Sequence, residues 1–179
     1  MTTSKSSELV EAADIEGVVL STPPIHEDER GSFSEVMRGS MYGSVFPQSN
    51  LSISRPGVLR GLHFHRKQAD LWLLLEGSAQ VGLVDLRTPG SLRSASVVLD
   101  SGEPQTLFIP PGVAHGYLAL TECRLLYWVT EEYDVSDEYG LAWNDPSAAV
   151  PWENEDPVLS LRDQENPLLD GASIPRFEQ

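Results

Sequence analysis

The chain has 179 residues and a mass of 19.7 kDa, a length that predicts one domain able to bury a core. Acidic residues outnumber basic ones by 27 to 12, so the formal net charge is -15 and the isoelectric point is about 4.5. This shortage of Lys and Arg argues against a surface that binds nucleic acid or an anionic membrane.

The short apolar runs and the single cysteine indicate a cytoplasmic protein. The longest apolar run, around residues 71–75, is far shorter than the roughly 20 residues that span a bilayer, and the first residues lack the apolar stretch of a signal peptide. Cys123 excludes an intramolecular disulfide and a cysteine-based zinc site, and we expect it to lie buried in a strand. Any metal would therefore need His and carboxylate ligands.

Short apolar stretches separated by Pro and Gly predict an all-β domain without a long helix. Residues 1–14 are polar and acidic and predict a flexible segment, while 15–179 are expected to form one domain that ends in a loop and short-helix extension. The runs LWLLL and RLLYWV are apolar throughout and are expected in central strands. The predicted strands span residues 17–20, 33–37, 48–54, 58–65, 70–75, 78–85, 94–99, 105–109, 116–119, 124–130 and 141–143.

Three histidines carry the strongest chemical signal in the sequence. His63 and His65 are two residues apart on a predicted strand, so both side chains leave the same face. A Pro-Pro-Gly turn at 110–112 precedes His115, which places a third imidazole near the start of another strand. The two segments together resemble the paired motifs of cupins, which implies a jelly-roll barrel with short terminal appendages.

A more specific resemblance covers about residues 15–165. The segments DERGSFSE (28–35), QSNLSISRPGVLRGLHF (48–64), IPPGVAHGYLAL (109–120), LAWNDP (141–146) and LSLRD (159–163) occur in the order found in dTDP-4-dehydrorhamnose 3,5-epimerases. The sequence therefore resembles this family, with Tyr127 and the EEY at 131–133 in matching places.

The resemblance implies an epimerase that acts on a dTDP-4-keto-6-deoxyhexose at C3, C5 or both through an enolate. Such a reaction needs a base, an acid on the opposite face and a group that stabilises the oxyanion. By resemblance, the base is His63, the carboxylate that orients it is Asp163, and the acid is Tyr127. The resemblance also implies a homodimer with strand exchange and no cofactor.

The resemblance further assigns residues that would contact the substrate. Arginines of this set would pair with the pyrophosphate of the substrate. Tyr133 would stack on the nucleobase, and Phe33 would help to shape the nucleobase site. The full set is Arg30, Phe33, Glu35, Gln48, Asn50, Arg60, His115, Tyr133, Glu138 and Arg162.

Two positions depart from the family pattern. His65 stands where the family has a Gln-like residue, and Asp70 stands where a Lys would lie beside the 4-keto oxygen. A carboxylate beside a developing enolate is repulsive and should raise the barrier. Because the loop between these positions looks shorter than in the family, Lys67 or Arg66 is a candidate to supply the missing cation.

The same departures create a second hypothesis, a metal-dependent cupin. His63, His65, Asp70 and His115 have the spacing of a metal cupin and would suit Fe, Mn, Ni or Zn in a dioxygenase or a Lewis-acid isomerase. His63 would then be a ligand and not the free base, so the two mechanisms compete for one residue. A third hypothesis is a non-catalytic binder of nucleotide sugars.

Each of these residues also has a purely structural interpretation. His65 would be a hydrogen-bonding replacement for the family's amide, and Asp70 a solvated carboxylate at a strand edge. Tyr127 would be ordinary strand packing, and Asp163 would cap a C-terminal turn.

Overall fold

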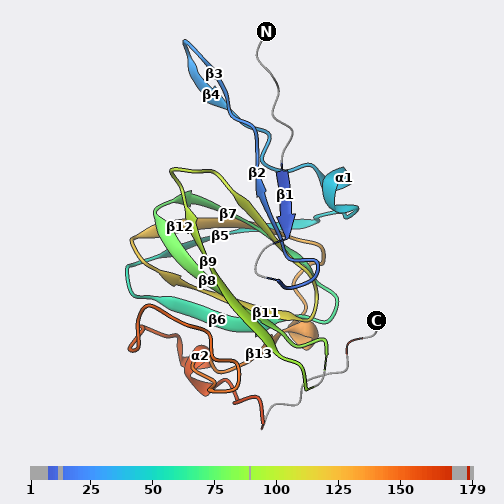
Figure 1. Ribbon diagram of the computed structural model, residues 1–179, viewed down its shortest axis with the longest axis vertical. Helices are drawn as coiled ribbons and strands as arrows, with labels where there is room; N and C mark the ends of the chain where they lie inside the picture. The colour runs from blue at the N-terminus through green and yellow to red at the C-terminus, as the bar shows by residue number, and fades with distance from the viewer. Residues whose placement is uncertain (1–7, 12–13, 89, 171–176, 178–179) are drawn as a thin grey trace.

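The protein is an all-β jelly-roll barrel built from two antiparallel sheets, as the computed structural model in Figure 1 shows for residues 8–11, 14–88, 90–170 and 177. The first sheet has the order β1-β2-β10-β7-β12-β5 and the second β13-β6-β11-β8-β9. The first contains β1 (Glu8–Glu11), β2 (Val19–Thr22), β10 (Thr106–Ile109), β7 (Asp70–Glu76), β12 (Cys123–Val129) and β5 (Gln48–Ser54). The second contains β13 (Tyr139–Gly140), β6 (Leu59–Phe64), β11 (Val113–Ala119), β8 (Ser78–Asp85) and β9 (Arg93–Asp100).

The smaller elements lie outside this barrel. A hairpin of β3 (His26–Asp28) and β4 (Gly31–Phe33) projects from the body, at the upper left of Figure 1. The helical segments are α1 (Gly39–Tyr42), a 3₁₀ turn (Val135–Asp137) and α2 (Leu161–Glu165). None of the helices in the described residues has the length and apolar composition of a membrane span.

The main core lies between the two sheets. Trp72 and Leu74 of β7 belong to the same buried cluster as Val81 and Leu83 of β8, on the opposite sheet. The LWLLL run lies in β7, between β10 and β12, and is buried from Leu71 to Leu74. The RLLYWV run lies in β12, where Leu125 and Val129 are buried and Leu126, Tyr127 and Trp128 are partly buried. Its neighbour β5 is the edge strand of the first sheet.

A second apolar cluster covers the outer face of the second sheet. Leu62 and Phe64 of β6 pack with Leu141 and Ala148 from the C-terminal part of the chain. The segment that follows β13 therefore closes this face, and it carries α2 to the edge of the barrel near β6 (Figure 1). The predicted loop and short-helix extension has this form over the described residues up to 170, whereas 171–176, 178 and 179 lie outside them.

Three expectations about the elements were wrong. The strand predicted at 33–37 is displaced to β4, because Asp28 accepts a hydrogen bond from the Arg30 N–H and Gly31 adopts φ 125°, which turns the chain earlier. The strand predicted at 141–143 lies earlier, at β13 (Tyr139–Gly140). A turn in which the Asp145 N–H donates to the Ala142 carbonyl follows it and ends the pairing with β6.

The third correction concerns the N-terminal segment predicted to be flexible. Its residues Glu8–Glu11 form β1, whose backbone pairs antiparallel with β2 and so satisfies polar groups that would otherwise face solvent. Residues 1–7 and 12–13 lie outside the described residues. The other predicted strands overlap β2 and β5–β12; the strand predicted at 17–20 lies two residues early, and the one at 116–119 begins three residues late.

Two motif glycines allow β6 and β11 to approach closely. A Cβ added at Gly61 would lie 2.6 Å from the Gly116 Cα, and one added at Gly116 would lie 2.6 Å from the Arg60 carbonyl oxygen. The register of this pair shifts between His115 and Tyr117, and His115 lies opposite His63. The RGLH and AHG motifs are therefore halves of one backbone contact that sets two histidines side by side.

Replacement of Gly116 by Ala should destabilise the fold. Because the new methyl group meets backbone that cannot rotate away, we expect the free energy of unfolding to fall by about 1–3 kcal/mol in urea titrations. Gly102→Ala is the control, since its nearest neighbour is the movable Asp100 carboxylate, and its effect should stay within about 0.5 kcal/mol. Equal stability of both variants would contradict the close approach.

Candidate active site

A cavity of about 310 Å³ lies between the two sheets and is bordered by α2 and the segment before β13. Its lining includes all three residues predicted to be catalytic: His63 from β6, Tyr127 from β12 and Asp163 from α2. His63 and Tyr127 therefore enter the cavity from different sheets.

The cavity also gathers seven of the residues predicted to contact the substrate. They come from three strands (β5, β6 and β11), from α2 and from the segment between β12 and β13. They are Gln48, Asn50, Arg60, His115, Tyr133, Glu138 and Arg162.

His63 is oriented by the Asp163 carboxylate. The His63 Nε2 lies 2.7 Å from Asp163 Oδ1, and because an ionised carboxylate only accepts, Nε2 carries the proton and Nδ1 is left with the lone pair. Asp163 is fixed in turn by Ser160, whose hydroxyl donates to Oδ2 at 2.8 Å and accepts the Asp163 N–H at 3.1 Å. A half-exposed imidazole with a buried carboxylate behind it is the arrangement of a general base.

Hydrogen bonding keeps Asp163 ionised. Burial alone raises the pKa of this carboxyl, but the hydrogen bonds from His63, Ser160 and the Gly61 N–H outweigh burial and leave the pKa below its usual value. Asp163 also lies in the first turn of α2, after the N-cap Ser160. Ser160 therefore caps this helix, and the expectation that Asp163 itself caps a turn was wrong. The same Ser160 hydroxyl holds the Asp163 carboxylate, so the helix start and the orientation of His63 depend on one side chain.

Tyr127 faces the cavity as a protonated phenol. Burial raises the pKa of Tyr127, and the negative charges of Asp70 and Glu138 raise it further, while Arg60 acts in the opposite direction. A phenol that keeps its proton at neutral pH can donate it to a carbon on the far side from a base.

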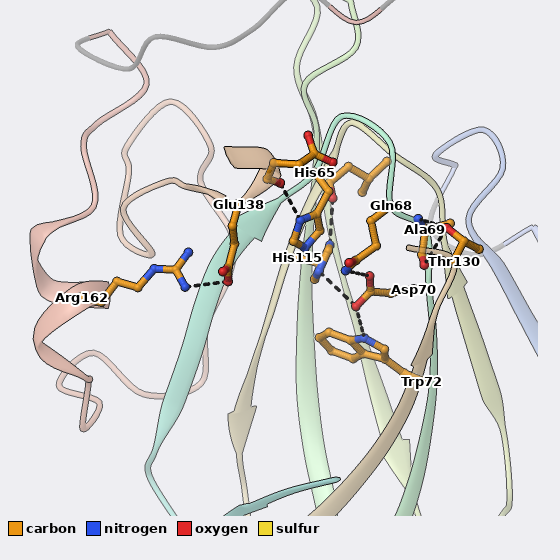
Figure 2. A network of polar contacts seen from close by, with 11 residues as sticks. His65, Gln68, Ala69, Asp70, Trp72, His115, Thr130, Glu138 and Arg162 are labelled. Atoms are coloured by element: carbon orange, nitrogen blue, oxygen red, sulfur yellow. Dashed lines mark hydrogen bonds and ion pairs between the residues drawn. The ribbon is translucent and has the colours of Figure 1, made fainter. Parts of the chain in front are cut away.

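Asp70 is buried and not a solvated carboxylate at a strand edge, so that expectation was wrong. It is 3% exposed in the central strand β7 and accepts hydrogen bonds from Gln68 Nε2 at 2.8 Å and Trp72 Nε1 at 3.1 Å (Figure 2). His115 Nε2 lies 3.7 Å from Asp70 Oδ2. His65 completes the group, with one ligand atom of each of the three within 4.8 Å of the others.

This His65–Asp70–His115 cluster corrects the metal hypothesis drawn from the sequence. The four predicted ligands do not form one group, because His63 is not among the clustered residues and is bonded to Asp163. The remaining three are buried or half-buried in the cavity wall. The expected competition for His63 between a base and a metal ligand therefore does not arise.

His115 is a neutral imidazole in this cluster. Its burial lowers the pKa well below the usual histidine range, against the opposite effect of the Asp70 charge. Its Nδ1 lies 2.9 Å from the Val113 carbonyl oxygen, which can only accept, so the proton is on Nδ1.

Both arginines that line the cavity among the described residues have hydrogen-bond partners. Arg162 donates to Glu138 at 2.6 Å, the contact drawn at the left of Figure 2, and Arg60 donates to the Ser54 hydroxyl at 2.9 Å. Tyr133 is 66% exposed and lines the cavity, so its ring is accessible for stacking.

Some predicted residues do not reach the cavity of their own chain. Arg30 and Phe33 lie on the β3–β4 hairpin and Glu35 follows it, and none of them lines the cavity. Arg66 and Lys67 are exposed and do not line it either, because the Asp137 carboxylate accepts both of their backbone N–H groups and holds the loop outside. Lys67 lines an adjoining hollow with His65, Gln68 and Glu138, so the expectation that one of them replaces the missing lysine stays a prediction.

Several site residues were missed by reasoning from the sequence. Ser160 could have been found, since Ser160 and Asp163 have the spacing of a capping box. Gln68, Trp72 and Asp137 carry no local signal, because their importance comes from contacts with Asp70 and with the loop at 66–67.

Comparisons with known proteins agree on one family. Residues 12–171 match the family model described as dTDP-4-dehydrorhamnose 3,5-epimerase. The chain is 35% identical over 185 residues to the dTDP-4-dehydrorhamnose 3,5-epimerase of Mycobacterium tuberculosis, which covers 93% of this chain and 92% of that protein. It is 39% identical over 148 residues to the spore coat polysaccharide biosynthesis protein SpsL of Bacillus subtilis, which covers 79% of this chain and 98% of that protein.

A solved structure supports the same conclusion. The fold is similar to that of dTDP-6-deoxy-D-glucose-3,5-epimerase from Legionella pneumophila in complex with dTDP-4-keto-L-rhamnose, with a TM-score of 0.89 and 28% sequence identity. The match covers 97% of this chain and 100% of that one.

Replacement of Asp163 by Asn should weaken the fold in a pH-dependent way. A hydrogen bond to a charged group contributes about 1.5–3 kcal/mol, so a loss of this order is expected at pH 7. The folded pKa of Asp163 is lowered, so its stabilisation is complete above the unfolded pKa near about 3.9 and disappears as the pH falls through the folded pKa. In urea unfolding, the difference between the two proteins should therefore shrink as the pH falls through the folded pKa of Asp163; a constant difference at all pH values would contradict the assignment.

Proposed function

The chain belongs to the dTDP-4-dehydrorhamnose 3,5-epimerase family, and from this membership we propose that His63, Asp163 and Tyr127 carry the proton transfers of its reaction. The protein is an epimerase that acts on a dTDP-4-keto-6-deoxyhexose at C3, C5 or both. The observation that supports the residue roles best is the entry of a carboxylate-oriented imidazole and a protonated phenol into one cavity from different sheets.

The proposed reaction follows from the acidity of carbon next to a ketone. The His63 Nδ1 removes the proton from C3 or C5, and the C–H electrons form the double bond of an enolate, with negative charge on the 4-oxygen. Asp163 stabilises the imidazolium that results. Tyr127 then protonates the carbon from the other face, and exchange with water restores both side chains. Neither an oxidant nor a reductant is needed, so we propose that the reaction uses no redox cofactor.

The cavity residues also support binding of the nucleotide part of the substrate. The guanidinium groups of Arg60 and Arg162 are the candidates for the pyrophosphate, since planar guanidinium pairs well with phosphate oxygens. The exposed ring of Tyr133 is the candidate for stacking on the nucleobase of the substrate. Gln48 donates a hydrogen bond to Asn50 at 3.0 Å, and the two side chains offer polar groups to the nucleobase.

The exposed apolar groups at β5 and the hairpin support a homodimer. Along β5, Gln48, Asn50 and Ser52 line the cavity, while Leu51 and Ile53 on its other face are 56% and 54% exposed. An exposed apolar edge strand is normally covered. We propose that a second chain covers it.

The same assembly accounts for the residues that miss the cavity. The β3–β4 hairpin projects from the body, and its Phe33 is 68% exposed. We propose that the hairpin brings Arg30, Phe33 and Glu35 to the partner's cavity, as strand exchange would require. A cytoplasmic location stays a prediction, and the free buried thiol of Cys123 needs no oxidising compartment.

Deuterium wash-in tests the catalytic roles. With dTDP-4-keto-6-deoxyglucose in D₂O, the wild-type protein should exchange protons at C3, C5 or both, as followed by NMR. His63→Asn should slow this exchange by about 10²–10⁴-fold, the usual contribution of a general base. Exchange at the wild-type rate in His63→Asn would refute the proposed base.

Tyr127→Phe should separate exchange from inversion. His63 can still remove a proton and return deuterium on its own face, so wash-in should persist while formation of the epimer slows by about 10²-fold or more. Tyr117→Phe is the matched control: it removes a hydroxyl from the same cavity, but one that is bonded to Ser52 and Ser54 at 2.9 Å. Loss of inversion in Tyr117→Phe alone would transfer the acid role to Tyr117.

The proposed dimer predicts a kinetic effect from a residue remote from the cavity of its own chain. Arg30→Ala should raise KM about tenfold or more with little change in kcat, since a hydrogen bond to a charged group contributes about 1.5–3 kcal/mol. Arg124→Ala, which removes an exposed arginine paired with Glu76, should leave KM unchanged. Sedimentation should give twice the mass of one chain. A monomer, or an unchanged KM in Arg30→Ala, would contradict the exchange.

A further inference from the structure

Three hydrogen-bond acceptors converge in the cavity wall without a donor between them. The Nδ1 atoms of His65 and His115 each lie 2.9 Å from a backbone carbonyl oxygen, of Asp137 and Val113 respectively. A carbonyl only accepts, so Nδ1 carries a proton in both rings, and in the neutral form of each ring Nε2 presents a lone pair. Together with the Asp70 carboxylate, this makes two neutral nitrogens and one anionic oxygen that converge in the cavity wall (Figure 2).

Such an arrangement is unfavourable unless a positive group lies among the acceptors. The His115 Nε2 and Asp70 Oδ2 are 3.7 Å apart, too far for a hydrogen bond and close enough for their lone pairs to repel. Among the described residues that line the cavity, the arginines are Arg60 and Arg162, and these donate to Ser54 and Glu138. The neighbouring Gln68 and Trp72 donate to Asp70 alone.

The surroundings of the cluster are those that orient metal ligands. Ligating histidines usually donate their other ring N–H to a carbonyl or a carboxylate, which fixes the tautomer and directs the free nitrogen at the ion. His65 and His115 both do so. Ligating carboxylates are themselves hydrogen-bonded, as Asp70 is by Gln68 and Trp72.

We propose that His65, Asp70 and His115 bind a divalent first-row transition ion. Two imidazoles and one carboxylate with open positions suit ions such as Zn²⁺ or Fe²⁺. Bonds of about 2.0–2.2 Å place ligand atoms roughly 3–3.5 Å apart, so the present group, within 4.8 Å, must contract by up to about 1.3–1.8 Å. His65 is only half-buried and can rotate to make this adjustment.

The ion would supply the positive charge that the family lysine provides elsewhere. By the sequence resemblance, Asp70 stands where the family has that lysine, and a bare carboxylate there would repel the enolate. With a divalent ion bound, the position has a net positive charge and can stabilise the 4-oxygen as a Lewis acid. This role, though not the binding itself, rests on the proposed epimerase function. His63 lies outside the cluster and remains free to act as the base.

Metal binding is tested directly with protein stripped by a chelator. Titration with Co²⁺, followed by its visible absorption, and with Zn²⁺ by calorimetry should show one ion per chain. His65→Gln and Asp70→Asn should each lower the affinity by more than about 100-fold, since loss of an outer-shell partner alone costs 10–100-fold. His63→Asn is the matched control and should bind the ion as the wild type does.

Two results would overturn the site. One is the absence of stoichiometric binding to the wild type, and the other is equal binding by the wild type and by both His65→Gln and Asp70→Asn. Circular dichroism of each variant shows whether it is folded, and because His65 is half-buried, His65→Gln gives a result even if the buried Asp70→Asn does not fold. Binding that is lost in His63→Asn would place the ion elsewhere and would also count against the cluster.

Activity separates the role of the ion from the reaction itself. Deuterium exchange that disappears in the stripped protein and returns with Zn²⁺ or Fe²⁺ would support the ion as the oxyanion stabiliser. Exchange at the full rate in the stripped protein would overturn that role while leaving the epimerase intact. If the ion binds tightly but no exchange occurs under any condition, the metal site is supported and the proposed catalytic roles of His63 and Tyr127 are overturned.

Discussion

The close contact between β6 and β11 is the constraint on which the rest of the site depends. Glycines at 61 and 116 let the two backbones approach to a distance that no Cβ would allow. The contact sets His63 opposite His115 and directs both motif histidines toward one cavity. The opposite wall comes from β7 and β12, which are paired so that Trp72 lies beside Tyr127. A jelly roll with a looser pairing at this point would retain its core and separate the residues of its two motifs.

Because the chain is strongly acidic, binding of an anionic substrate depends on how charges are distributed inside the cavity. With a net charge of -15, the protein as a whole repels a nucleotide diphosphate, so binding depends on local cations. The cavity wall adds three carboxylates, Asp70, Glu138 and Asp163. Glu138 is paired with the cationic Arg162, and Asp163 with His63, which becomes cationic when it takes up a proton. Asp70 has neutral donors only, so it is the group whose charge still needs a partner.

The sequence was sufficient to predict the barrel and most of the cavity, because both depend on local patterns. Alternation and turn residues located β2 and β5–β12, and the resemblance through RGLH and PPGVAHG located His63 and His115. Reasoning from the sequence falls short where tertiary contacts decide. No local pattern shows that Asp70 is buried by Trp72 and Gln68, or that Asp137 holds Arg66 and Lys67 outside the cavity. Spacing alone also grouped His63 with the other histidines, because it cannot show that Asp163, a hundred residues away, binds it first.

The three cavity histidines differ in the ring nitrogen that each presents, and this difference defines their chemistry. His63 gives its Nε2–H to a carboxylate, so Nδ1 is the free nitrogen and its basicity is supported by a negative charge. His65 and His115 give their Nδ1–H to backbone carbonyls, so Nε2 is free and faces Asp70. A base needs the first arrangement because the proton it takes up must be stabilised. A ligand needs the second because its lone pair must stay unprotonated near an anion. The backbone carbonyls of Val113 and Asp137 and the carboxylate of Asp163 thus assign different roles to identical side chains in one cavity.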